Sequence, residues 1–153
     1  MNLLKIPDQL AEAHPVLPVR VRRFVAKSDA AIIAPWWSKR GLTPPVGALL
    51  PFTGVIVEYE SIPTACAFLY EDKAGNVAMI EWECTNPEIG AMRTIKALHV
   101  LFDFFERYAQ EQGILFILSW TAEERGDGRI LRSRKWVKLP GPRHELMCFS
   151  KSF

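Results

Sequence analysis

The chain has 153 residues, a formal net charge of +2 at pH 7 and 49% hydrophobic residues. This length suits one domain with a substantial core, and the apolar content excludes a disordered chain. Every apolar run is interrupted by Lys, Arg, Asp or Glu before it reaches membrane-spanning length. The N-terminus lacks the charged start, apolar stretch and cleavage site of a signal peptide, so we expect a cytoplasmic protein with no membrane partner.

We expect residues 1–15 to form a lead-in and residues 16–153 to form a single domain. Residues 16–27 alternate valine with arginine, which is typical of a half-buried strand.

A short helix is predicted over residues 30–41. Ser28 and Asp29 can cap its start. Pro35 breaks or kinks it, and Gly41 ends it.

Two β-rich runs, 52–59 and 62–70, are separated only by Glu60-Ser61, which predicts a hairpin. The next strand is predicted over residues 76–85.

A long amphipathic helix follows this strand. Asn86 serves as its predicted N-cap, Pro87 occupies its first turn, and Gly113 stops it. Apolar residues at three-to-four spacing predict one buried stripe, made of Ile95, Leu98, Phe102, Phe105 and Ala109. The apolar run 114–120 then predicts a strand that is covered on both faces.

A short helix near 127–135 and a last strand over 145–150 complete the order. Antiparallel strands followed by a strand–helix–strand crossover indicate an α/β (α+β) domain. Its mixed sheet carries helices on both faces.

This order resembles the fold of the GNAT acyltransferases over about residues 16–150. The resemblance implies a mostly antiparallel sheet of six to seven strands and acetyl-CoA as the acyl donor. It also implies that segment 79–98 binds the pyrophosphate, that 127–135 lies beside the pantetheine, and that 30–40 shapes the acceptor pocket. The late segment RILRSRKWVKL looks like the family's short helix before a strand, with Trp136 at the aromatic position.

Two departures from the family pattern stand out. The family's pyrophosphate loop reads Arg/Gln-x-x-Gly-x-Gly/Ala, whereas residues 87–92 match it only at Gly90 and add the negative charge of Glu88. The tyrosine that often acts as general acid is replaced by Leu131 or Arg132. The chain is also similar to small divergent GNAT-like proteins of bacteriophages, some of which modify bases in DNA.

Glu81 and Glu83 are the candidate catalytic residues. Amine acylation needs a base because only the neutral amine attacks a thioester, and a carboxylate with a raised pKa can serve. Alternation along the strand places both on one face, with Glu81 slightly ahead. Glu58 is a weaker alternative, and pairing of these carboxylates with arginines is the structural alternative.

The candidate cofactor site is the end of this strand with the loop and helix start after it. Backbone amides around 90–93 can hold a pyrophosphate, and Arg93 or Lys96 can add charge. The alternative is an ordinary capped helix that binds nothing. The residues assigned to the cofactor are Trp82, Cys84, Asn86, Gly90, Ala91, Met92, Arg93, Arg129 and Arg132.

Trp36 and Trp37 are adjacent on a helix and cannot both face one core direction. One of them is therefore expected to be exposed or to line an acceptor pocket, with Glu58 as a further substrate contact; burial in the core is the alternative. Ser119, Thr121 and Ser133 can each donate a proton to a thiolate leaving group, and the sequence singles out none of them.

Basic residues gather early and late in the chain. If the two clusters meet, they form one basic surface that suits a nucleic acid; otherwise they are solvated faces. The members are Arg20, Arg22, Arg23 and Lys27, and then Arg129, Arg132, Arg134, Lys135, Lys138 and Arg143.

The remaining titratable residues predict no metal site. The histidines are scattered, and no spacing matches a known set of ligands. Cys66, Cys84 and Cys148 are expected to be buried free thiols.

Three functions are compatible with these features. The first is an acyl-CoA-dependent N-acyltransferase in which a small-molecule or protein amine attacks the thioester directly. The second is a GNAT-shaped binding or regulatory module without activity, and the third is a protein that acts on nucleic acid. The oligomeric state, monomer or homodimer, stays open.

Overall fold

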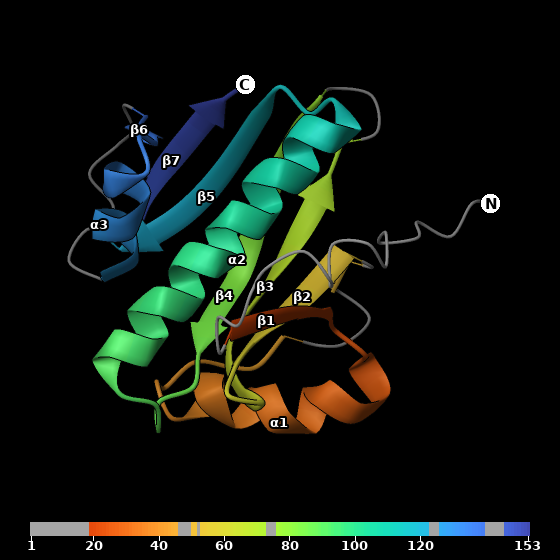
Figure 1. Cartoon of the computed structure of the whole chain (residues 1–153), viewed down its shortest axis with the longest axis vertical. Coiled ribbons are helices and arrows are strands. Elements are labelled where there is room, and N and C mark those ends of the chain that lie inside the picture. The colour runs from red at the N-terminus through yellow and green to blue at the C-terminus, as the bar shows by residue number, and fades with distance from the viewer. Residues whose placement is uncertain (1–18, 46–49, 52, 73–75, 123–125, 140–145) are drawn as a thin grey trace.

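The computed structural model describes residues 19–45, 50–51, 53–72, 76–122, 126–139 and 146–153. The predicted lead-in 1–15 and the basic residue Arg143 lie outside them. Seven strands form one sheet with the order β1-β2-β3-β4-β5-β7-β6, in which only β4 and β5 pair in parallel. The elements are β1 (Val19–Arg23), α1 (Ala26–Ser38), β2 (Thr53–Tyr59), β3 (Ile62–Glu71), β4 (Val77–Thr85), α2 (Ala91–Gln112), β5 (Phe116–Ala122), α3 (Gly126–Ser133), β6 (Val137–Lys138) and β7 (Leu146–Ser152) (Figure 1).

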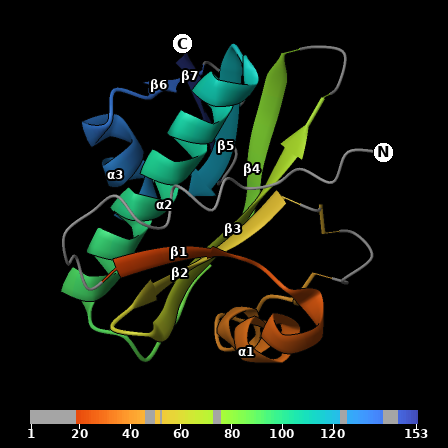
Figure 2. The ribbon, with the colours of Figure 1, turned by 45° about the vertical axis from the view of Figure 1, so that its right-hand side comes forward.

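Helices cover both faces of this sheet, as predicted, because the strands β2 and β3 alternate apolar residues toward two cores. One core packs Val55, Ala67 and Leu69 against α2 and α3. The other packs Ile56 and Phe68 against α1. Figure 2 shows α1 on one side of the sheet and α2 with α3 on the other. The predicted mixed α/β sheet with helices on both faces is confirmed.

The predicted hairpin is also confirmed. Glu60 and Ser61 connect β2 to β3, and both have positive φ values of 51° and 66°. Two consecutive residues with positive φ define the tight turn whose twist matches that of the flanking strands.

Helix α1 begins four residues earlier than predicted. Asp29 lies inside the first turns, where its carboxylate accepts the Val25 N–H at 2.7 Å and two hydrogen bonds from Arg22. It therefore holds the helix start from within and does not cap it from outside. Pro35 does not break the helix, which continues to Ser38, and Gly41 follows with a positive φ of 72°.

Helix α2 begins at Ala91, so the prediction that Asn86 and Pro87 start it is wrong. Asn86 instead closes a turn: its side-chain oxygen accepts the Glu88 N–H, and its side-chain nitrogen donates to the carbonyl of Pro63 on β3. The helix ends as predicted at Gly113, in the left-handed conformation with φ 70°. Most of the predicted stripe is buried, but Ile95 is 43% exposed.

Strand β5 is covered on one face only, contrary to the prediction. Ile117, Ser119 and Thr121 are buried, whereas Phe116 and Trp120 are 46% and 43% exposed. The alternation follows from helix placement, because α2 and α3 share one core and lie on the same side of the sheet.

The sheet splits between β4 and β5. The two strands pair only from Val77–Phe116 to Ile80–Ser119. Immediately beyond this point Trp82 has a φ of 56°, and the pairing of β4 with β3 shifts register. An extra residue of this kind bends a strand. The second half of β4 therefore diverges from β5 and leaves its edge open (Figure 1).

Candidate functional site

The bulge at Trp82 separates the two candidate carboxylates. Glu81 pairs with Phe68, whose side chain belongs to the core under α1. Glu83 accepts a 3.4 Å hydrogen bond from the Ser119 hydroxyl of β5, next to Ile117 of the α2 core. The prediction that Glu81 and Glu83 share one face is therefore wrong, because the extra residue reverses the alternation after it.

Glu81 is half-buried and has no hydrogen-bond or ion-pair partner among the residues described. Burial raises its pKa above the usual 4.5. A carboxylate without a partner in a partly apolar environment is poised to accept a proton, but it also destabilises the folded state when it is ionised.

Glu81→Gln is expected to raise the melting temperature at pH 7.5. The pKa of Glu81 is higher folded than unfolded, so its ionisation penalises folding only above about pH 4.5. The gain should shrink as the pH falls through the folded-state pKa. Thermal melts of wild type, Glu81→Gln and the exposed-site control Glu111→Gln at pH 4 and 7.5 measure it. A lower melting temperature for Glu81→Gln at pH 7.5 would contradict the conclusion that the ionised Glu81 carboxylate destabilises the folded state.

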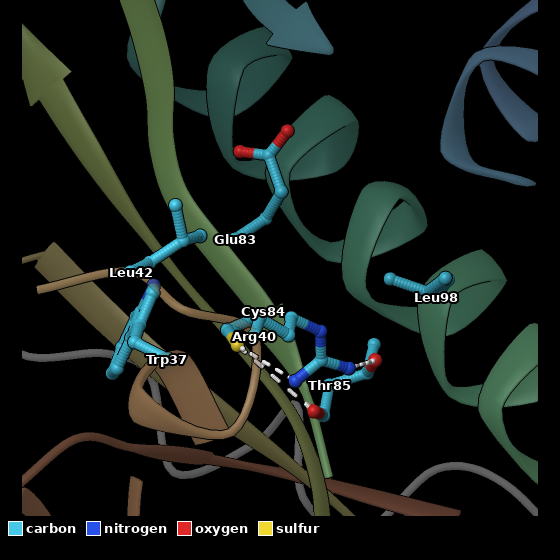
Figure 3. Close-up of a pocket in the computed structure, with 7 residues that line it drawn as sticks. All are labelled: Trp37, Arg40, Leu42, Glu83, Cys84, Thr85 and Leu98. Atoms are coloured by element: carbon cyan, nitrogen blue, oxygen red, sulfur yellow. Dashed lines mark hydrogen bonds between the residues drawn. The ribbon is translucent and has the colours of Figure 1, made fainter. Parts of the chain in front are cut away.

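A pocket of about 440 Å³ lies along the open edge of β4. Its wall joins the end of α1 and the following turn, the last residues of β4, and one residue of α2. The lining residues are Trp37, Arg40, Leu42, Glu83, Cys84, Thr85 and Leu98. Figure 3 shows the Glu83 carboxylate directed toward α2 and the Arg40 guanidinium lying beside Cys84 and Thr85. Glu83 is thus the candidate base that lines the pocket.

No sequence pattern singled out Arg40. It belongs to the turn after α1, and its guanidinium donates to the carbonyl of Trp36 at 2.8 Å, to the Thr85 hydroxyl at 2.8 Å and to the Cys84 sulfur at 3.4 Å. The contacts with Cys84 and Thr85 join segments more than forty residues apart, so a motif search along the chain does not detect them.

Side chains of the loop between β4 and α2 contact the loop itself, the end of α1 and β3. Glu88 is largely exposed and forms an ion pair with Lys39. The hydrogen bond and the charge of Lys39 lower the Glu88 pKa. The negative charge that departs from the family pattern is therefore balanced by the α1 side. Asn86 is occupied by its two loop contacts and supports the loop's shape.

Free backbone donors gather at the start of α2. Among the described residues, no hydrogen-bond acceptor is found for the amides of Gly90, Ala91 and Met92, and all three residues are exposed. No atom lies within 4 Å of a Cβ built at Gly90, so the space beside it is open. A helix start with free N–H groups favours an anion.

Arg93 does not face this open space as an unpaired charge. It forms an ion pair with Glu60 at 3.2 Å and stacks over the Tyr59 ring. Residues of the β2–β3 hairpin therefore bind the Arg93 guanidinium, which was predicted to contact a phosphate. Lys96, one turn further along α2, is exposed and has no partner in the part of the chain that the structure describes.

A second pocket, of about 310 Å³, lies between α2 and α3. It is lined by Ile95, Arg129, Ile130 and Ser133. Arg129 is exposed and finds no partner within the described ranges, whereas Arg132 donates back to the Gly128 carbonyl. The exposure of Ile95 has its explanation here, since its side chain forms part of this pocket.

The other predicted substrate contacts have structural roles. Trp36 and Trp37 are 4% and 3% exposed, so the expectation that one is exposed is wrong, although Trp37 lines the larger pocket. Both belong to the core between α1 and the sheet, against which Leu50 also packs. Glu58 accepts a 2.6 Å hydrogen bond from Arg22, which also holds the buried Asp29.

Among the described residues, the two basic clusters do not meet. Strand β1, which carries Arg20 and Arg22, forms one edge of the sheet, and β6, which carries Lys138 of the late cluster, forms the opposite edge. Arg22 and Arg134 are also used in internal ion pairs. The described residues of these segments therefore do not form the single basic surface that was predicted for the case in which the clusters meet.

Cys66 and Cys84 are buried free thiols on paired positions of β3 and β4, as predicted, and burial raises the pKa of Cys66. The side chain of Cys148, the third predicted thiol, lies outside the described part of the structure. In the described ranges, no three His, Cys, Asp or Glu side chains come close enough to hold a metal ion. No helix there has the length and apolar character needed to cross a membrane.

Known structures identify the fold. No protein-family model and no curated protein matches the chain. The structure of Ard1 from Thermoplasma volcanium superimposes with a TM-score of 0.69 at 13% identity, over 89% of this chain and 98% of that one. The ribosomal-protein-S18-alanine N-acetyltransferase from Escherichia coli gives 0.67 at 7% identity, over 86% and 90%. The chain has the GNAT acyltransferase fold, and the predicted resemblance is confirmed at that level.

A third match links the fold to a bound ligand. N-acetylglutamate synthase from Neisseria gonorrhoeae, solved with coenzyme A and N-acetyl-glutamate, gives a TM-score of 0.65 at 14% identity over 92% of this chain. This chain spans only 36% of that larger protein.

Proposed function

We propose that the protein is an acetyl-CoA-dependent N-acyltransferase. The observation that carries the proposal is the split between β4 and β5, which lies next to free amides at the start of α2 and a pocket that contains a carboxylate. An anion site, an open strand edge and a proton acceptor are the parts that this transfer needs. The GNAT fold, and the coenzyme A named for one similar solved structure, support the same function.

In this proposal the cofactor enters from the α2–α3 side. The amides of Gly90, Ala91 and Met92 hold the pyrophosphate, and Lys96 and Arg129 supply the positive charge that Arg93 does not. The pocket beside Ile95 and Ile130 offers apolar surface for the pantetheine arm. Acetyl-CoA supplies the thioester, and the edge of β4 beyond the bulge, at Trp82 to Cys84, orients its carbonyl.

Glu83 takes the role of general base. Geometry decides for Glu83 over Glu81, because a base must lie where the reactants meet, and Glu83 lines the pocket and contacts Ser119 of the facing strand. Its carboxylate accepts a proton from the ammonium, and the neutral amine attacks the thioester carbon. The C–S bond then breaks, coenzyme A leaves as the thiolate, and the proton that the attacking nitrogen loses converts that thiolate to the thiol. The acceptor reaches the pocket past Trp37 and Leu42.

Ala91→Pro tests the anion site without altering the helix. Ala91 is the first residue of α2, where proline is well tolerated, and Gly90 before it has the extended conformation that proline requires (φ −64°, ψ 150°). The variant removes one N–H donor. Because a hydrogen bond to a charged group contributes about 1.5–3 kcal/mol, acetyl-CoA affinity should fall by about 10- to 100-fold.

Calorimetric titration of acetyl-CoA into wild type, Ala91→Pro and the control Ala91→Ser measures this effect. Serine adds bulk but keeps the N–H, so Ala91→Ser should bind as wild type does. Wild type that binds no acetyl-CoA, or equal affinities for all three proteins, would remove the cofactor site from this loop.

A further inference from the structure

The larger pocket contains two opposite charges that do not pair with each other. Glu83 and Arg40 both line it, yet the ion pairs of the described residues include none that involves Arg40. Figure 3 shows the Glu83 carboxylate directed away from the Arg40 guanidinium, so the two groups can contact different ends of one ligand in the pocket.

Arg40 is held in place by neutral groups only. The carbonyl of Trp36, the hydroxyl of Thr85 and the sulfur of Cys84 accept hydrogen bonds from its two terminal nitrogens. An arginine that only capped the end of α1 would need no more than the first of these contacts. The other two draw the guanidinium to the pocket wall and leave its positive charge without a counter-ion.

The guanidinium also has donors to spare. Arginine carries five N–H groups, and the three contacts use three of them, on Nη1 and Nη2. The Nε–H and one Nη2–H remain. Two donors on one rigid, permanently charged group recognise a carboxylate or another oxyanion better than a neutral ligand.

From this arrangement we infer that the acceptor is an amine that also carries an anionic group, such as an amino acid. Arg40 holds its carboxylate, and Glu83 faces its ammonium. The inference rests on the proposed function, in which this pocket takes the acceptor. A cofactor phosphate is the other possible source of an anion, but Arg40 approaches from the α1 side, whereas the free amides and the second pocket lie toward α2 and α3.

The test compares amines that differ only in the anionic group, in the absence of acetyl-CoA. The probes are the ω-amino acids from glycine to 6-aminohexanoate and the n-alkylamines of matching length. At least one amino acid should bind wild type about 10-fold or more tightly than its matched amine, as a charge-assisted hydrogen bond requires, and should shift the NMR signal of the Arg40 Nε–H. Equal binding of each pair, or no binding by any probe, overturns the inference.

Arg40→Gln and Arg40→Lys complete the design. In Arg40→Gln, each amino acid and its matched alkylamine should bind with nearly equal affinity. Arg40→Lys keeps the positive charge and should keep part of the preference for the amino acid. Acetyl-CoA affinity should change by less than about 2-fold in both variants, within the scatter expected for a group that does not contact the cofactor. A large loss of acetyl-CoA affinity would place a cofactor phosphate at Arg40 and overturn the inference.

Should Arg40→Gln fail to fold, the wild-type Nε–H signal still decides, because an unshifted signal contradicts the assignment. If the protein binds an amino acid but no acetyl-CoA, the transferase proposal is refuted, while the assignment of this pocket to an amine with an anionic group stands.

Discussion

Glu83→Gln is expected to lower kcat for acetyl transfer by about 10²- to 10⁴-fold, the range associated with the loss of a general base. Glutamine keeps the size of the side chain and can still accept the Ser119 hydrogen bond, but it cannot take a proton from the amine. Acetyl-CoA affinity should be unchanged. Release of the coenzyme A thiol in the presence of an amine measures the rate.

The chain offers a matched control for this variant. Glu81→Gln makes the same chemical change two residues away, on the opposite face of β4, and should lower kcat by no more than a few-fold. Raising the pH toward the pKa of the amine should restore part of the Glu83→Gln rate, because the neutral amine then forms without a base. A larger loss for Glu81→Gln than for Glu83→Gln would transfer the role of base to Glu81.

Glu106→Ala is expected to destabilise the fold by about 3–5 kcal/mol. Among the described residues, it leaves the partly buried Lys151 without a counter-charge and leaves Arg134 with only the exposed Asp103. The Glu106 carboxylate accepts hydrogen bonds from Arg134 at 3.0 and 3.1 Å, from Lys151 at 2.6 Å and from Trp136 at 2.7 Å. This cluster ties α2 to the segment after α3 and to β7. Urea unfolding at pH 7 measures the loss.

The pH dependence of stability gives a second readout for Glu106. Burial alone would raise its pKa, but the hydrogen bonds from Arg134, Lys151 and Trp136 outweigh burial and lower it. A carboxylate with a lowered folded-state pKa stabilises the protein above pH 4.5 and loses that contribution as the pH falls through the folded value. The difference in the free energy of unfolding between wild type and Glu106→Ala should therefore become smaller at acidic pH. The control Glu111→Ala, at an exposed site on the same helix, should change the free energy of unfolding little. Equal free energies of unfolding for the two variants would show that the cluster contributes nothing to stability.

The fold was predictable where short-range patterns determine it. Two runs rich in β-forming residues predicted β2 and β3, the two-residue connection predicted their turn, and three-to-four spacing with a glycine stop predicted α2 and its end. These features depend on neighbours within a few positions. The order of elements then indicated the GNAT fold, which the solved structures share.

The arrangement of the site was less predictable because it depends on single residues and distant contacts. A tryptophan seldom adopts positive φ, so nothing along β4 marked Trp82 as a bulge, and the faces of Glu81 and Glu83 were assigned by unbroken alternation. Asn-Pro indicated a helix start, whereas contacts with β3 made Asn86 part of the loop. The basic segments had similar composition, but strand order placed them at opposite edges.

A crystal soaked with acetyl-CoA tests the proposed site most directly. The expected electron density places the pyrophosphate against the amides of Gly90, Ala91 and Met92 and the thioester between β4 and β5, within reach of the Glu83 side of the pocket. A cofactor bound elsewhere on the chain, or a split that stays empty at saturating acetyl-CoA, would contradict the assignment of this GNAT-fold protein as an acetyltransferase.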